Sequence, residues 1–103
     1  MKFIKIITIC GSLKFQKEMM EEAQRLAFEG NCVLTPIYPV PINFEVTSEI
    51  LSLLKVAHKE RIRMSDAIFV INKDGYIGDS TILEIEYAKS LHKEIDYYVD
   101  VLN

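Results

Sequence analysis

Features that reveal the function of many proteins are scarce in this 103-residue chain. Its two cysteines, Cys10 and Cys32, form no CxxC pair and have no histidine cluster nearby, so neither a disulfide framework nor a zinc site is expected. We interpret both as buried free thiols. Lysine and arginine are scattered among acidic residues, and the net charge is −3, which argues against nucleic acid as a partner.

Long apolar runs are also missing. The apolar stretch at residues 1–10 is interrupted by Lys2 and Lys5, and it is too short for a membrane span or for a secretion signal with a cleavage site. We therefore expect a cytoplasmic protein without membrane contact. Neither a P-loop nor a GxGxxG fingerprint occurs in the sequence, which excludes these two common nucleotide-binding loops.

The composition is nevertheless that of a globular protein, with 50% hydrophobic and 26% charged residues. A chain of this length is too short to build two separate cores, so we expect residues 1–103 to form a single domain. So small a domain cannot bury all of its isoleucine, leucine and valine side chains alone. A homodimer or a higher homo-oligomer is therefore expected.

Strand-like and helix-like segments alternate along the chain. Runs of β-branched and apolar residues predict strands at 3–10, 32–37, 67–72 and 94–99. Apolar residues at helical spacing predict helices at 15–29, 47–64 and 81–92. Three prolines at residues 36–41 predict a loop, a candidate lid, in which Tyr38 and Phe44 either stack on a base or simply pack.

This alternation requires parallel strands joined by right-handed crossovers. It favours a small three-layer α/β fold of the Rossmann or flavodoxin type, with four strands in the order 2-1-3-4. The ligand crevice of such a sheet lies beyond the carboxyl ends of the strands, where the strand order reverses. The two loops expected there are residues 11–14, which follow the first strand, and residues 72–80, which follow the third.

Both loops contain groups that are able to hold a ligand. Gly11 and Ser12 could offer backbone amides to a phosphate, and Lys14 could offer a cation. The second loop supplies a turn, hydroxyls and free amides at the start of a helix, a combination suited to an anionic or hydroxyl-rich group. An ordinary helix N-cap explains the same residues, which are Gly78, Asp79, Ser80 and Thr81.

Glu84 is the residue that most strongly indicates a site. On a helical wheel it lies about 20° from Leu91 and about 40° from Ala88, whereas Glu86 lies about 160° away among polar residues. An inward carboxylate near the start of a helix is costly unless it is hydrogen-bonded or used in chemistry. Two interpretations stay open: a nucleophile kept ionised by the helix N-terminus, or a capping-box partner of the Thr81 amide.

His58 and Arg61 lie on the inward side of the helix predicted at 47–64, an unusual place for such groups. A satisfied core histidine, and an arginine that snorkels or pairs with Asp66, are the ordinary explanation. If the helix begins at Thr47, His58 lies about 15 Å along it, well below the strand ends. That position argues against a direct role unless the helix starts later in the chain.

A resemblance to a known family rests on residues 9–12, on Ile62 and Asp66 before an apolar strand, and on residues 80–88 with Lys93. Together these segments resemble the nucleoside 2-deoxyribosyltransferase superfamily, including its deoxynucleoside monophosphate N-glycosidase branch. The resemblance implies that Glu84 attacks the anomeric carbon of a 2-deoxyriboside, releasing the base and forming a glycosyl-enzyme ester. A second base or water then resolves the ester, and neither a metal nor a cofactor is needed.

Further roles follow from the resemblance alone. Gly11 and Ser12, with Lys14, would hold the 5′-phosphate, and the segment from Gly78 through Asp79 and Ser80 to Thr81 would hold the sugar. Thr8 stands where a tyrosine usually lines the site, so it too would contact the substrate. His58 stands where an aspartate is usual, and it could protonate the departing base.

The resulting expectation is N-glycosyl cleavage or transfer on a nucleoside or a nucleoside 5′-monophosphate. The alternative is a non-catalytic nucleotide or nucleotide-sugar binding protein of the same fold, which the differences at Thr8 and His58 would allow. A third possibility is an oligomeric scaffold in which Glu84 only caps its helix.

Overall fold

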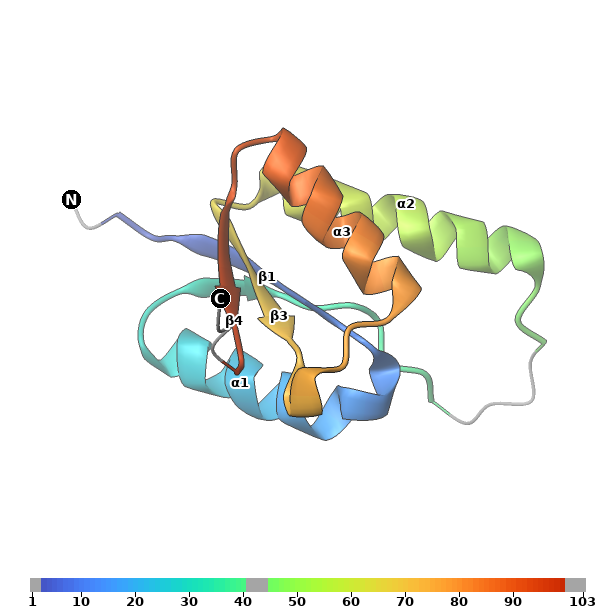
Figure 1. The fold of residues 1–103 in the computed structure, drawn as a ribbon, viewed down its shortest axis with the longest axis horizontal. Coiled ribbons are helices and arrows are strands. Elements are labelled where there is room, and N and C mark those ends of the chain that lie inside the picture. The colour runs from blue at the N-terminus through green and yellow to red at the C-terminus, as the bar shows by residue number, and fades with distance from the viewer. Residues whose placement is uncertain (1–2, 41–44, 100–103) are drawn as a thin grey trace.

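The computed structural model describes residues 3–40 and 45–99. A parallel sheet lies at its centre, in the order β2-β1-β3-β4 (Figure 1). The strands are β1 (Ile6–Gly11), β2 (Cys32–Leu34), β3 (Ala67–Ile71) and β4 (Glu94–Tyr97). The predicted α/β fold and strand order are confirmed.

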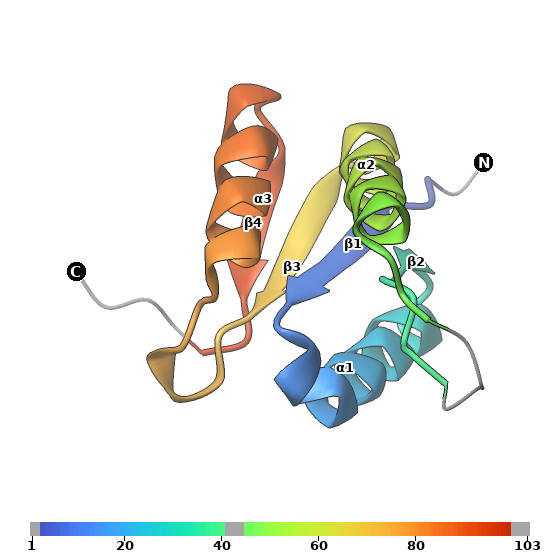
Figure 2. The ribbon, with the colours of Figure 1, turned by 90° about the vertical axis from the view of Figure 1, so that its right-hand side faces the viewer.

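Helices cover both faces of the sheet, as Figure 2 shows. The helix α1 (Gln16–Phe28) lies on one face, and α2 (Ser48–Met64) and α3 (Asp79–Ser90) lie together on the other. Short 3-10 helices, η1 (Leu13–Phe15) and η2 (Lys73–Gly75), follow β1 and β3. No helix within the described residues is long and apolar enough to cross a membrane.

Two apolar clusters form the core, one on each side of the sheet. All five residues of β3 are buried, as expected of a central strand that is covered on both faces. Alternate residues of β3 therefore enter different clusters: Phe69 packs towards α1, whereas Ile68 and Val70 pack towards α2 and α3. The side chain of Cys10 belongs to the second cluster, so the thiol of β1 points to the same side as α2 and α3.

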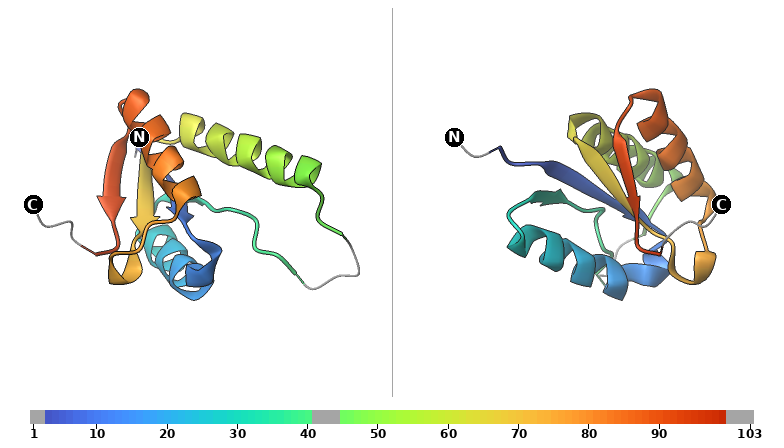
Figure 3. Two further views of the ribbon diagram at one scale, coloured as in Figure 1. Left: turned by 45° about the vertical axis from the view of Figure 1, so that its right-hand side comes forward. Right: turned by 60° about the vertical axis from the view of Figure 1, so that its left-hand side comes forward.

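The helix α2 extends beyond the sheet. Figure 1 and Figure 3 show its amino-terminal half projecting past the carboxyl ends of the strands, while its carboxyl-terminal half packs on the sheet. A helix of 17 residues is about 25 Å long, which exceeds the length of any strand here. The overhang brings the middle of α2, rather than its first turn, to the level of the strand ends.

Several predicted boundaries are wrong, although every predicted element exists. The strand β1 begins at Ile6 rather than at residue 3, and the side chain of Phe3 is 77% exposed. The edge strand β2 ends at Leu34, two residues before Pro36, which has no N–H for a sheet hydrogen bond. Cys32 on this edge strand is exposed, so only Cys10 is a buried thiol as expected.

Candidate functional site

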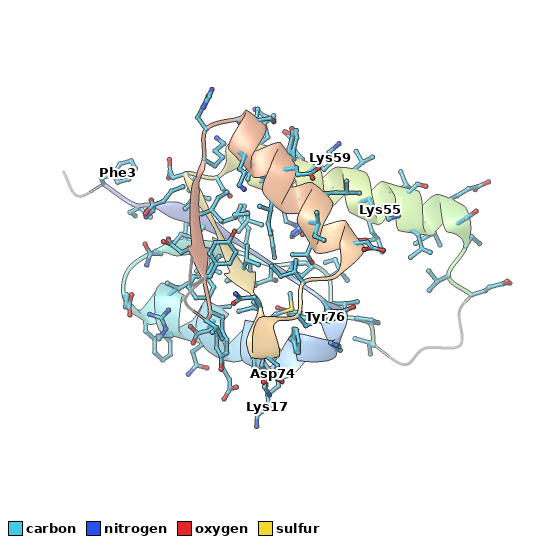
Figure 4. The ribbon with its side chains drawn as sticks, viewed as in Figure 1. Phe3, Lys17, Lys55, Lys59, Asp74 and Tyr76 are labelled. Atoms are coloured by element: carbon cyan, nitrogen blue, oxygen red, sulfur yellow. The ribbon has the colours of Figure 1, made fainter. Side chains whose placement is uncertain are left out.

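A cavity of about 460 Å³ opens beyond the carboxyl ends of β1 and β3, where the strand order reverses. The loops after β1 and β3, the overhanging part of α2 and the first turns of α3 form its walls. Figure 4 labels two of the lining residues, Lys55 on α2 and Tyr76 in the loop before α3. The lining residues predicted from the sequence are Gly11, Ser12, His58, Gly78, Asp79, Ser80, Thr81 and Glu84.

The turn after β1 approaches β3 closely. A side chain at Gly11 would place its Cβ 3.2 Å from Ile71 Cβ and 3.3 Å from the Ile71 carbonyl oxygen, so any larger residue would crowd β3. Ser12 then caps η1, and its Oγ accepts a hydrogen bond from the Lys14 backbone N–H at 3.3 Å. Lys14 itself does not line the cavity. Its Nζ lies 3.3 Å from the centre of the Tyr76 ring, at the rim.

The helix α3 begins two residues earlier than predicted, at Asp79, with Gly78 as its N-cap. Gly78 has no side chain to cap the first turn, so the amides there remain available to a ligand. Thr81 is already inside the helix and is buried. Because the capping box requires Thr81 as the N-cap, the capping interpretation of Glu84 is wrong.

Glu84 lies on the cavity wall with its side chain 22% exposed. As the sixth residue of α3 it is beyond the first turn, where the free amides of a helix end. The expected stabilisation of its charge by the helix N-terminus is therefore not found. Burial instead raises the pKa of Glu84 to about 7, an effect that a hydrogen bond with the Cys10 thiol partly opposes.

His58 is next to Glu84, contrary to the position inferred from helix length. Its Nε2 lies 3.7 Å from Glu84 Oε1 and 3.6 Å from Cys10 Sγ. The distance from the start of α2 to His58 agrees with the one inferred from the sequence. Because the helix starts beyond the sheet, this distance brings the histidine to the level of the strand ends. Burial, together with the nearby charge of Arg61, lowers the pKa of His58 to about 4, and the imidazole is neutral at pH 7.

Arg61 contacts the other side of this imidazole. Its Nη1 lies 3.1 Å from His58 Nδ1. The pair with Asp66 that was one expectation does not form, and Asp66 Oδ2 instead accepts a hydrogen bond from the Ile6 N–H at 2.8 Å. Among the described residues Arg61 makes no ion pair, although it is half-buried and lines the cavity.

Thr8 does not reach the cavity. It is fully buried, and its Oγ1 lies 2.6 Å from Ser65 Oγ, which in turn donates to the Arg61 carbonyl oxygen at 2.7 Å. The hydroxyl therefore anchors the end of α2 to β1, and the prediction that Thr8 lines the site is wrong. Tyr38 packs against the cluster under α1 and does not line the cavity, while Phe44 lies outside the described residues.

A metal ion fits this site poorly, although the ligand atoms of Cys10, His58 and Glu84 all lie within 4.8 Å of one another. A metal-bound histidine normally donates its second ring N–H to an acceptor. Here the second nitrogen faces Arg61, which can only donate and which also carries a positive charge. The surroundings of His58 thus oppose a second cation.

The fold is also found in solved structures. A 2-deoxyribosyltransferase from Leishmania mexicana superposes with a TM-score of 0.67 at 19% sequence identity, over 91% of this chain and 63% of that one. The chain has a nucleoside 2-deoxyribosyltransferase-like fold. A conserved protein from Enterococcus faecalis V583 shares this fold, with a TM-score of 0.66 at 17% identity over 92% of this chain and 63% of that one.

The chain thus spans less than two thirds of the length of both structures. At these identities the likeness establishes the fold alone. No family model matches the sequence, and no curated protein sequence matches it.

Sequence reasoning missed several residues that line the cavity. Pro36 and Ile37, together with Leu51 and Leu54 on α2, form an apolar wall. Lys55 adds a cation to the same helix. Helical spacing placed His58 and Arg61 on the inward face of this helix, but nothing in the sequence showed that the face overhangs the sheet and borders a cavity rather than the core.

Proposed function

We propose that this protein cleaves or transfers the N-glycosyl bond of a nucleoside or a nucleoside 5′-monophosphate, preferentially with a 2-deoxy sugar. The observation that carries the proposal is the position of Glu84. It is a largely buried carboxylate on a cavity that lies between two amide-rich turns, and no lysine or arginine neutralises it among the described residues. Such a group is costly to keep for stability alone, which favours a role in chemistry.

Glu84 acts as the nucleophile in this proposal. One carboxylate oxygen attacks C1′ of the sugar, the C1′–N bond breaks, and its electron pair leaves with the base. The product is a glycosyl ester on Glu84. Water or a second base then attacks C1′ and releases the carboxylate, so the configuration at C1′ is retained after two displacements.

The other walls bind and orient the substrate. At the start of α3, the Asp79 carboxylate accepts hydrogen bonds from the sugar hydroxyls and the Ser80 hydroxyl donates one to the sugar. Gly78 and Thr81 shape the same turn. The amides around Gly11 and Ser12 hold the 5′ end, and Lys14 on the Tyr76 ring adds a positive charge at the rim. The neutral His58 contacts the base as a hydrogen-bond donor rather than as a cationic acid.

The test is to incubate the protein with each 2′-deoxynucleoside and its 5′-monophosphate and to measure release of the free base. Glu84→Ala should abolish release, whereas Glu86→Ala, on the exposed face of the same helix, should leave it unchanged. A covalent sugar adduct on Glu84 should be detectable by mass spectrometry with a slow substrate. Release that survives in the Glu84→Ala variant would refute the mechanism, and binding without release would favour a nucleotide-binding protein.

A further inference from the structure

The wall of the cavity that α2 provides carries three polar side chains, and all three present hydrogen-bond donors. They are Lys55, His58 and Arg61. Lysine and arginine have no acceptor atom. The remaining lining residues of α2, Leu51 and Leu54, are apolar, so the histidine decides the hydrogen-bonding character of this wall.

The contact with Arg61 fixes which nitrogen of His58 carries the proton. Because Arg61 can only donate, His58 Nδ1 at 3.1 Å must be the acceptor. The single proton of the neutral ring is then on Nε2, on the side of Glu84 and the cavity. His58 therefore also presents a donor, and the wall offers only donors to a ligand.

Arg61 adds a second reason to expect an acceptor on the ligand. The protein has three arginines, and the other two pair with glutamates: Arg25 with Glu22 and Glu29, and Arg63 with Glu60. Arg61 is the half-buried one, and its described hydrogen bond to His58 uses one of five N–H groups. Partly buried donors without partners are unfavourable, so a ligand that supplies acceptors is favoured there.

The adjoining wall, which α3 provides, has the reverse character. The carboxylates of Asp79 and Glu84 on α3 accept hydrogen bonds, as suits the hydroxyl groups of a sugar. A ligand between the two walls is thus oriented with its hydroxyl-rich end at α3 and its acceptor-rich end at α2.

We propose, resting on the function proposed above, that His58 and Arg61 select bases that carry a carbonyl oxygen over bases that carry an amino group at the same position. A carbonyl oxygen accepts a hydrogen bond from the guanidinium of Arg61 or from the Nε2–H of His58, which lie on different sides of the imidazole ring. An exocyclic amino group would instead place N–H groups against N–H groups and leave donors on both sides unsatisfied. The preferred substrates are nucleosides of oxo bases.

Two matched pairs of substrates test this inference: 2′-deoxyuridine against 2′-deoxycytidine, and 2′-deoxyinosine against 2′-deoxyadenosine. Within each pair the base differs in one exocyclic group and the adjoining ring nitrogen. The kcat/KM of the wild type should favour the oxo member of each pair by about tenfold or more, the size expected when buried donors lose their acceptor. Arg61→Met should bring both ratios to within about threefold, mainly through the oxo substrates.

Arg63→Met is the matched control. This arginine lies two residues after Arg61 on the same helix, is exposed, and pairs with Glu60. It should leave both ratios unchanged. Equal rates within the pairs, a preference for the amino members, or an equal loss on all four substrates in Arg61→Met would each overturn the inference.

Equilibrium binding separates this inference from the proposed function. The dissociation constants of the same four nucleosides, measured by calorimetry in the Glu84→Ala variant, should show the oxo preference without turnover. If the wild type cleaves none of them but the preference is present and depends on Arg61, the inference stands and the proposed chemistry fails. Cleavage without any oxo preference would support the proposed chemistry and overturn the inference.

Discussion

Glu84→Gln should make the protein more stable at pH 8, although it removes the proposed nucleophile. Burial keeps the native carboxyl protonated up to a pKa of about 7, whereas in the unfolded chain the proton is lost near 4.5. Between these values the native state binds more protons than the unfolded state, so the contribution of Glu84 to stability falls as the pH rises. Above pH 7 the native protein holds a charge that is largely removed from water.

The magnitude follows from the two pKa values. At about 1.4 kcal/mol for each tenfold change in the ionisation constant, the difference between 4.5 and about 7 corresponds to about 3 kcal/mol. Glutamine is nearly isosteric with glutamate and has no charge to bury. The stability of Glu84→Gln relative to wild type should therefore rise by about 3 kcal/mol between pH 4 and pH 8.

His58 makes the comparison with a variant necessary. Its native pKa is lowered to about 4 from 6.5, so its contribution to stability is lost as the pH falls through that interval. The two effects have opposite signs over nearly the same range and largely cancel in the wild type. Glu84→Gln removes one of them, and the stability of this variant should rise from pH 4 to pH 6.5.

Urea unfolding, followed by circular dichroism from pH 4 to pH 8.5, measures this effect. At ordinary urea dependences a change of about 3 kcal/mol moves the midpoint by about 1–3 M. Glu86→Gln removes an exposed carboxylate from the same helix and should change stability by only about 0.5 kcal/mol at any pH. A stability difference between Glu84→Gln and wild type that does not vary with pH would refute the desolvation of Glu84.

Three further predictions concern activity and packing. The kcat/KM for an uncharged deoxynucleoside should rise about tenfold per pH unit below pH 7 and level off above pH 7. The reason is that the attacking Glu84 must be ionised and its pKa is about 7. A pH profile without this rise would contradict a nucleophilic carboxylate. Thr8→Val should lower the unfolding free energy by about 1–2 kcal/mol, because Ser65 loses a hydrogen bond. The kcat/KM of the folded protein should be unchanged. A selective loss of activity would indicate that Thr8 does contact the substrate. Gly11→Ala should lower the unfolding free energy by about 1–3 kcal/mol through the contact with Ile71, and an unaffected urea midpoint would show that the turn can relax.

Local patterns in the sequence determined the architecture. Alternating strand and helix signals led to the strand order 2-1-3-4, and that order located the crevice beyond β1 and β3. Helical periodicity separated the inward Glu84 from the exposed Glu86. These inferences succeeded because chain connectivity and side-chain direction within an element depend on local geometry. Which of the lining residues act in catalysis remains a prediction.

Element boundaries limited what local patterns could show about charge. A shift of two residues in the start of α3 removed Thr81 from the N-cap and placed Glu84 beyond the first turn. Both predicted influences on its carboxylate, the capping bond and the helix N-terminus, depended on that boundary. The actual influence, burial among side chains from β1 and α2, involves contacts between segments far apart in the chain.

Only the tertiary structure decided how the site is assembled. The distance along α2 to His58 was correct, but the overhang of this helix determined that the histidine meets Glu84 and Cys10. The sequence allowed Asp66 to pair with Arg61. In the structure Asp66 accepts a hydrogen bond from the Ile6 N–H, and the guanidinium of Arg61 lies beside His58. Periodicity along one element gives the direction in which a side chain points. It does not give the position of that element along its neighbours, because packing between elements determines that position.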